Sequence, residues 1–208
     1  MTSTETEVSV GRHANVLLCI HEPSKEIAVW ERTLPRQLTQ WLNQLAPGQL
    51  PRARMTLMPG EAALKIRASC DACGTPAVAE REHLIADIAD LVKHFAHLAG
   101  CDTVRFRLDA IDHNSCSKWH RDSVALRLIT TYRGPGTQWV AATGSVDVLA
   151  RPNDEAAVAR TMQAGDVAVF RGKGASDRAN GGGIVHRSPP IAGQKLTRLV
   201  LVLDLPSH

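Results

Sequence analysis

The amino-acid sequence predicts a single α+β domain, in which residues 101–206 form a jelly roll and residues 1–100 form a mixed, mainly helical layer packed outside it. Two observations lead to this prediction. The hydrophobic period is three to four residues in the clearest segment before residue 100 and two residues after it. The second half also holds many short β-type runs without a helical pattern between them, which is typical of a sandwich or jelly roll. At 208 residues, the chain is long enough to bury one large core.

A short strand and two helices are predicted in the N-terminal half. Residues 27–30 form a β-type run, and Pro35 opens a helix that ends before Pro47. The clearest helix covers residues 80–99, because apolar residues recur there at intervals of three and four, its start is acidic and Gly100 follows it. We expect this helix to pack on the outer face of the jelly roll through Leu84, Ile88, Leu91 and Phe95.

After residue 100 the sequence reads as strands and turns. Val104, Phe106 and Leu108 alternate with charged residues, as expected of a half-buried strand. The last run before the C-terminus is almost wholly apolar. Predicted strands therefore cover residues 104–109, 124–132, 138–140, 167–170, 184–186 and 197–205.

Composition and charge argue against several classes of protein. Lys plus Arg number 24 and Asp plus Glu number 21, and the excess is not clustered, which argues against a nucleic-acid partner. No apolar run approaches the roughly 20 residues of a membrane span, and the polar, acidic N-terminus is unlike a secretory leader. The odd number of cysteines is typical of reduced thiols. We expect a cytoplasmic protein that acts on a small-molecule or protein substrate, with its oligomeric state left open.

The segment Trp119-His120-Arg121-Asp122 carries the most specific chemistry in the chain. Residues two apart on a strand project to one face, so His120 and Asp122 can present an imidazole and a carboxylate together. His186 lies in another β-type run and can approach from a facing strand. Two His and one carboxylate on one side of a metal form the facial triad of non-haem Fe(II) oxygenases. The alternative is that His120 and Asp122 are ordinary surface residues of an edge strand.

A cation near the C-terminus extends this pattern. Oxygenases with this triad commonly use 2-oxoglutarate, whose distal carboxylate needs a charged partner inside the barrel. Arg198 is the first candidate, because it begins an apolar strand and its planar fork can donate two hydrogen bonds to a carboxylate. Lys195 is the second candidate, and we expect it to be exposed in the preceding turn. The alternative for Arg198 is an ion pair with a surface carboxylate.

Longer stretches around these residues resemble a known family. The segments CSKWHRD, LRL, TYRGPGTQW and GIVHRSPP, at residues 116–122, 126–128, 131–139 and 183–190, are similar to the bacterial family called domain of unknown function 1826. That family name implies no activity.

The ligand residues themselves resemble a larger group. His120, Asp122, His186 and Arg198 are similar to the ligand and co-substrate motif of the 2-oxoglutarate/Fe(II)-dependent dioxygenase superfamily. This resemblance implies a double-stranded β-helix in which the first three residues hold Fe(II) and Arg198, or else Lys195, holds 2-oxoglutarate.

Further residues are candidates for the surroundings of the metal. Tyr132 and Trp139 flank the turn at residues 134–137, where they can line a substrate pocket or pack in the core. Arg127 has the opposite parity to the ligand pair and is expected to point away from the site. The glycine-rich stretch 171–183 is either a lid over the metal or a plain solvated connection.

The cysteines offer a rival metal site. Cys70 and Cys73 form a Cys-X-X-Cys turn, and His113, Cys116 and His120 have plausible ligand spacing. A structural zinc site normally has four ligands, often from two such turns, and this chain has one turn of that kind. A redox pair is a further alternative, which requires an electropositive setting.

The leading hypothesis is therefore a non-haem Fe(II)-dependent, 2-oxoglutarate-dependent oxygenase that hydroxylates or demethylates a substrate the sequence does not identify. The alternative is a non-catalytic protein, either a zinc-handling, metal-binding module or a jelly-roll binding domain. The identity of the bound metal and the turnover of 2-oxoglutarate distinguish these two hypotheses.

Overall fold

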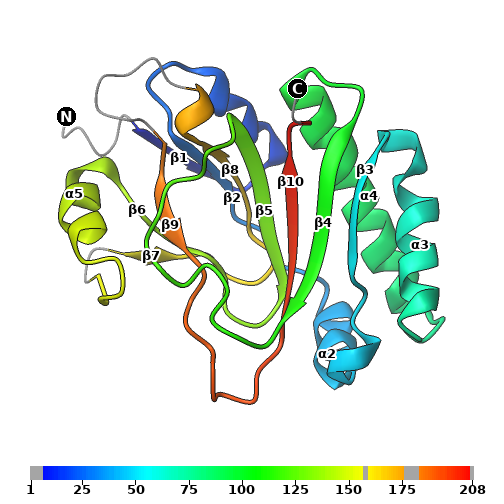
Figure 1. Ribbon diagram of the computed structural model, residues 1–208. Coiled ribbons are helices and arrows are strands. Elements are labelled where there is room, and N and C mark those ends of the chain that lie inside the picture. Colours follow the sequence, from blue (N-terminus) through cyan, green and yellow to red (C-terminus); the bar gives the residue numbers. More distant parts are fainter. Residues whose placement is uncertain (1–6, 157–158, 176–182, 207–208) are drawn as a thin grey trace.

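Seven strands form a large sheet within the part of the chain that the computed structural model describes, which is residues 7–156, 159–175 and 183–206 (Figure 1). The order across the sheet is β1-β2-β8-β5-β10-β4-β3. Strands β1 and β2 are parallel, and the other neighbours are antiparallel. The architecture is therefore mixed α+β with a large, mostly antiparallel sheet. Its strands are β1 (Val8–Gly11), β2 (Ile27–Trp30), β3 (Ala53–Leu57), β4 (Val104–Ile111), β5 (Leu126–Arg133), β8 (Val167–Arg171) and β10 (Arg198–Asp204).

Three helices cover one face of the large sheet (Figure 1), namely α2 (Arg36–Gln44), α3 (Ala62–Ala72) and α4 (Ala79–Ala99). Helix α4 confirms the helix predicted over residues 80–99, and Gly100 ends it in the left-handed conformation at φ 63°. The predicted apolar stripe of α4 is buried in a cluster with the sheet, including Leu84, Ile88, Leu91 and Phe95. No helix among the described residues is long and apolar enough to cross a bilayer.

A second, smaller sheet faces the other side of the large one. Its strands, in the order β7-β6-β9, are β6 (Gln138–Val140), β7 (Arg160–Thr161) and β9 (Val185–Arg187). An apolar cluster fills the space between the sheets and joins Phe170 and Val200 of the large sheet to Trp139 and Ile184. Helix α5 (Ala142–Ala150) packs on the outside of the small sheet. We call the side of the large sheet that faces the small sheet its inner face.

Strand β10 shows why the last predicted strand is so apolar. It lies between β5 and β4, with helices over one face and the small sheet over the other, so all of its residues are buried. Leu199, Leu201 and Leu203 pack under the helices. Val200 and Val202 belong to the cluster between the sheets.

Several local predictions need correction. The N-terminal half contributes three strands to the large sheet instead of one, because main-chain pairing at a sheet edge stabilises short segments whose own pattern is weak. Helix α5 interrupts the strands of the C-terminal half, where no helix was predicted. The expected Cys-X-X-Cys turn begins inside α3. The connections include short 3-10 helices at η1 (Ala14–His21), η2 (Pro47–Gln49), η3 (Pro59–Glu61) and η4 (Lys173–Ala175).

Candidate metal centre

His120 and His186 lie side by side because their backbones form an antiparallel β-bridge. The amide of each donates to the carbonyl oxygen of the other, at 3.0 Å from His120 and 2.9 Å from His186. The centroids of the two imidazole rings are 4.5 Å apart. The bridge adds His120 to the edge of the small sheet next to β9, and in this way brings together two residues that are distant in the chain.

Asp122 completes the group. Its Oδ1 lies 3.8 Å from Nε2 of His120, and its Oδ2 lies 3.3 Å from Nε2 of His186. One ligand atom from each residue lies within 4.8 Å of the others, and no other such cluster of His, Cys, Asp or Glu occurs in the described ranges. The structure therefore brings together the three residues predicted as ligands, and their role as ligands remains a prediction.

Backbone carbonyl groups determine which imidazole nitrogens are available. Nδ1 of His120 lies 2.7 Å from the carbonyl oxygen of Lys118, and Nδ1 of His186 lies 3.3 Å from that of Ile184. Because a carbonyl oxygen only accepts, each Nδ1 donates to it, and in a neutral imidazole Nε2 is then the nitrogen with the lone pair. Metal-binding histidines commonly have their second nitrogen held in this way. Both Nε2 atoms lie close to Asp122.

Electrostatics favour the protonation states that a metal requires. Burial alone would raise the pKa of Asp122, but interactions with His186, Arg127 and His120 outweigh it and lower that pKa to about 2. Burial and the neighbouring His186 lower the pKa of His120. At neutral pH the centre therefore offers an ionised carboxylate beside the neutral imidazole of His120, as metal binding needs.

One buried atom of the group lacks a hydrogen-bond partner. Oδ2 of Asp122 is shielded from solvent and has no hydrogen-bond partner among the described residues. Leaving a buried polar atom unsatisfied costs about 1–3 kcal/mol, and more for a charged group. A divalent cation bound to Oδ2 and the two Nε2 atoms would satisfy it. Two imidazoles and one carboxylate with open positions suit Fe(II).

Arg127 holds the other oxygen of Asp122. Its Nη1 donates to Oδ1 of Asp122 at 2.5 Å, while Nε and Nη2 donate to the two carboxylate oxygens of Asp204 at 2.6 and 2.8 Å. The expectation that Arg127 points away from the site is wrong. Residues 121–125 are not a strand, so the alternation of side chains does not continue from His120 into β5.

The chain after β8 packs closely on the segment that follows Asp122. The amide of Lys173 donates to the carbonyl oxygen of Asp122 at 2.9 Å. A Cβ at Gly172 would lie 2.1 Å from the carbonyl oxygen of Val124, so this approach requires glycine. Residues 176–182, which form much of the predicted lid, lie outside the described residues.

A cavity of about 80 Å³ opens beside the three residues, and we call it the inner hollow. His120 and His186 line one side of it. The inner face of the large sheet lines the other side through Ile129, Val200 and Val202. A group bound at these three residues would therefore face apolar side chains of strands β5 and β10.

Arg198 is buried on the same face of β10 as Val200 and Val202. Its Nε donates to the carbonyl oxygen of Pro135 at 2.8 Å, and its Nη2 donates to Oγ1 of Thr131 at 3.4 Å. Arg198 forms no ion pair with a carboxylate in the described ranges. The alternative prediction, an ion pair with a surface carboxylate, is therefore not observed there. Burial lowers the pKa of Arg198 to about 10, so its guanidinium stays charged at neutral pH.

The turn at residues 134–137 and the turn that contains Lys195 both lie where they were predicted. Gly134 has a φ of +84°, and a Cβ there would lie 3.0 Å from Cγ of Arg198, so glycine allows the arginine to pack against this turn. Lys195 is exposed in the turn before β10, as expected. The assignment of a co-substrate to either cation remains a prediction.

The two predicted pocket aromatics lie on opposite faces of the large sheet. Tyr132 donates its hydroxyl to Oδ2 of Asp87 on α4 at 2.5 Å and packs in the cluster under the helices. Ile129 lies on the inner face, so the alternation of side chains along β5 places Tyr132 on the opposite face, toward the helices. The assignment of Tyr132 to the substrate pocket is therefore corrected. Trp139 is the register partner of His186 and packs between the sheets, so core packing is its observed use.

The rival zinc site is not assembled. Cys70 is buried under the helices, and Cys116 is exposed at the inner hollow. Neither these residues nor Cys73 belongs to a group of three potential ligands within the described ranges. All five cysteines are free thiols. Burial raises the pKa of Cys70 to about 11, which argues against a reactive redox pair.

Two further arginines at the site were missed in the sequence. Arg54 on β3 and Arg107 on β4 both line the inner hollow. The alternation along residues 104–109 already placed Arg107 on the polar face of a half-buried strand. The sequence contained no signal that this face borders the candidate metal ligands, because that depends on the pairing of β4 with β10.

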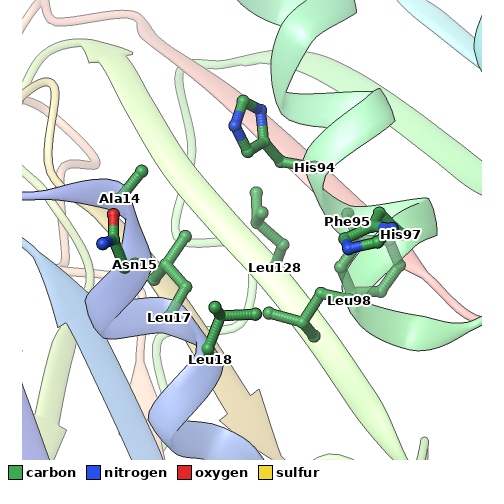
Figure 2. Close-up of a pocket in the computed structure, with 9 residues that line it drawn as sticks. All are labelled: Ala14, Asn15, Leu17, Leu18, His94, Phe95, His97, Leu98 and Leu128. Carbon is green, nitrogen blue, oxygen red and sulfur yellow. The ribbon is translucent and has the colours of Figure 1, made fainter.

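A separate hollow of about 180 Å³ lies on the helix side of the large sheet (Figure 2). Figure 2 shows leucine side chains from η1, α4 and β5 around it. Its polar side chains are Asn15, His94 and His97. Since Phe95 and Leu128 also line it and belong to the cluster under the helices, this hollow is distinct from the metal centre.

The family model described as Protein of unknown function (DUF1826) matches residues 11–204. The chain belongs to this family. The match confirms the resemblance seen in residues 116–190 and extends it over nearly the whole chain. No curated protein matches this DUF1826 chain.

Solved structures similar to the DUF1826 chain include plant and bacterial oxygenases. The dioxygenase for auxin oxidation 1 from Arabidopsis thaliana, in complex with 2-oxoglutarate, is 12% identical, with a TM-score of 0.46 over 97% of this chain and 92% of that one. The dioxygenase for auxin oxidation in rice is 14% identical, with a TM-score of 0.47 and coverages of 88% and 74%. A putative oxygenase from Shewanella oneidensis is 16% identical, with a TM-score of 0.44 and coverages of 97% and 90%. TM-scores this low assign no activity to the chain.

Proposed function

We propose that this protein is a non-haem Fe(II)-dependent, 2-oxoglutarate-dependent oxygenase that hydroxylates or demethylates its substrate. The observation that carries the proposal is the convergence of two imidazoles and one carboxylate. Their ligand atoms lie within 4.8 Å of one another at the edge of a cavity. This is the ligand set of a facial triad, which leaves positions on the metal open for other molecules.

The fold assignment is part of the same proposal. Two facing sheets with an apolar cluster between them, and ligands contributed from one edge of the small sheet, fit a jelly roll of the double-stranded β-helix type. In such a framework β9 and the β-bridge hold the two histidines, and Arg127 holds Asp122. Rigid placement matters, because a metal site needs its ligands held in position by packed neighbours.

Each residue of the centre has its own task. His120, His186 and Asp122 would hold Fe(II), and Arg127 keeps the Asp122 carboxylate turned so that Oδ2 faces the imidazoles. The bound Fe(II) and 2-oxoglutarate would supply the oxidising chemistry, coupling O₂ and decarboxylation of 2-oxoglutarate to oxidation of a substrate C–H bond.

Arg198 is the proposed anchor of the co-substrate. It is 1% exposed, lies on the face of β10 that borders the inner hollow, and has no carboxylate partner among the described residues. A dicarboxylate that reached from the metal ligands along Val200 would provide that partner. The apolar side chains of Ile129, Val200 and Val202 would exclude water from the path between them.

The test is the binding of metal and then of co-substrate to metal-free protein. Anaerobic calorimetric titration should show one Fe(II) or Mn(II) bound per chain, followed by one 2-oxoglutarate only when the metal is present. With O₂, the Fe(II) form should slowly convert 2-oxoglutarate to succinate. Zinc in the purified protein, together with no 2-oxoglutarate binding or consumption, would favour the non-catalytic alternative.

A further inference from the structure

A row of side chains leads from the metal centre to the edge of the large sheet. Ile129, Val202, Arg107 and Arg54 are register partners on the neighbouring strands β5, β10, β4 and β3. They therefore share the inner face. Neighbouring strands are about 4.8 Å apart, which places Arg107 roughly 5 Å and Arg54 roughly 10 Å beyond Val202.

Two hollows meet at the arginines of this row. Arg54 and Arg107 line the inner hollow, which reaches the metal ligands. They also line a wider cavity of about 270 Å³, here called the outer hollow, together with Thr56, Arg105 and Asp204. A molecule in the outer hollow can therefore contact both arginines, which also line the inner hollow.

The two arginines share one carboxylate. Arg54 donates to both oxygens of Asp109, at 3.1 and 3.2 Å. Nε of Arg107 lies 3.5 Å from Oδ2 of Asp109 but is buried there without a hydrogen-bond partner. Asp204 is already held by two hydrogen bonds from Arg127. The row thus retains donor capacity for a further anion.

The present ion pairs can be exchanged at little cost. The side chain of Arg54 is 71% exposed and that of Arg107 is 36% exposed. Ion pairs in such exposed positions contribute little to the stability of a protein. An arginine fork can instead donate two parallel hydrogen bonds to a carboxylate or a phosphate group.

We infer that Arg54 and Arg107 form the substrate-recognition site and bind an anionic group, a carboxylate or a phosphate, of a small-molecule substrate. The inference rests on the proposed function and adds the substrate class to it. The anionic group would lie in the outer hollow, and the carbon to be oxidised would reach roughly 5–10 Å across β10 and β4 into the inner hollow. Holding the anion at this distance would also keep it from occupying the metal.

The experiment uses probes that differ in charge and head group. Protein loaded with Mn(II) and 2-oxoglutarate is titrated anaerobically, at low ionic strength, with benzoate, phenyl phosphate and the neutral analogue benzamide. We expect an anion to bind and benzamide not to bind. The double variant Arg54→Gln/Arg107→Gln should bind the anion at least about tenfold more weakly, equivalent to one charge-assisted hydrogen bond.

Three controls separate recognition from folding and from co-substrate binding. The double variant should bind Mn(II) and 2-oxoglutarate as the wild type does. Arg67→Gln removes an exposed arginine paired with Glu82 on the helix side and should leave anion binding unchanged. Arg107→Lys keeps the charge but lacks the planar fork, so its affinity should lie between those of the wild type and the double variant.

The relative affinities of the two anions identify the anionic group of the substrate, and the variants test the inference itself. Tighter binding of phenyl phosphate assigns a phosphate ester, and tighter binding of benzoate assigns a carboxylic acid. The inference is overturned if neither anion binds the wild type, if the double variant binds equally well, or if the double variant loses 2-oxoglutarate instead. If the wild type binds no Mn(II) or 2-oxoglutarate, the proposed function fails, while the same anion titration on metal-free protein still tests the arginine pair.

Discussion

Arg127 and Asp122 are joined by a hydrogen bond of 2.5 Å between Nη1 and Oδ1, and the same guanidinium donates twice to Asp204. One arginine therefore lies between two carboxylates. Buried charges are costly unless their partners balance them. A divalent cation on the free oxygen of Asp122 would offset the remaining negative charge, so metal binding and the stability of this network should be linked.

Replacing Arg127 by Gln should weaken both the network and the metal site. Loss of a group that orients a metal ligand typically lowers affinity about 10- to 100-fold, and removing one member of a buried ion pair costs about 3–5 kcal/mol of folding stability. Anaerobic titration with Mn(II) and urea unfolding measure the two effects. The control is Arg133→Gln, at the end of the same strand, where the side chain donates to the carbonyl oxygen of Leu45. Unchanged metal affinity in Arg127→Gln would contradict the positioning role.

His120→Ala and Asp122→Ala should each abolish stoichiometric Fe(II) binding while the fold is retained. Each substitution removes one of three ligand atoms, and Arg127 keeps Asp204 as a partner in either variant. Calorimetry under anaerobic conditions tests binding, and circular dichroism tests the fold. His113→Ala, at an exposed histidine of the same segment, is the matched control. Wild-type affinity in both ligand variants would remove the facial-triad assignment.

Arg198→Ala should weaken 2-oxoglutarate binding by about 2–3 kcal/mol, the upper range for a hydrogen bond to a charged group, with Fe(II) affinity almost unchanged. Lys195→Ala should have little effect, because Lys195 is exposed in a turn whereas Arg198 is buried beside the inner face. Titration of the Mn(II)-loaded variants with 2-oxoglutarate gives both values. A larger loss in Lys195→Ala would move the anchor to the lysine.

Tyr132→Phe should lower folding stability and leave the metal centre unaffected. The substitution removes the hydroxyl that donates to Asp87, which also pairs with Arg32, so Asp87 loses a neighbour but keeps its main partner. We expect a loss of about 1–2 kcal/mol in urea unfolding, as for one buried hydrogen bond. If metal or 2-oxoglutarate affinity changed while stability did not, the side chain would act at the site after all.

Cys70 should resist alkylation in the folded protein. Burial raises the pKa of its thiol to about 11, so the thiol keeps its proton at lower pH and little of the reactive thiolate is present at pH 8. Iodoacetamide at that pH should modify the exposed Cys116 and reach Cys70 only after unfolding in urea. Mass spectrometry of the labelled peptides makes the comparison. Rapid native labelling of Cys70 would restore the redox-pair interpretation.

The elements whose stability depends on local periodicity could be predicted from the amino-acid sequence. The stripe of α4, the alternation of β4 and the apolar run of β10 could be predicted, because each pattern reflects which faces are buried. The three residues that the structure brings together, His120, Asp122 and His186, could also be singled out by their residue types, and their role as metal ligands remains a prediction.

Which faces and residues meet depends on the packing of distant segments against one another. Parity predicted the wrong direction for Arg127 because an irregular segment separates it from Asp122, and it could not tell that Tyr132 faces the helices. The bridge between His120 and His186 and the row from Ile129 to Arg54 join segments that are far apart in the chain. Such neighbours depend on strand order and register, which arise from the packing of the whole sheet and leave no local pattern in the sequence.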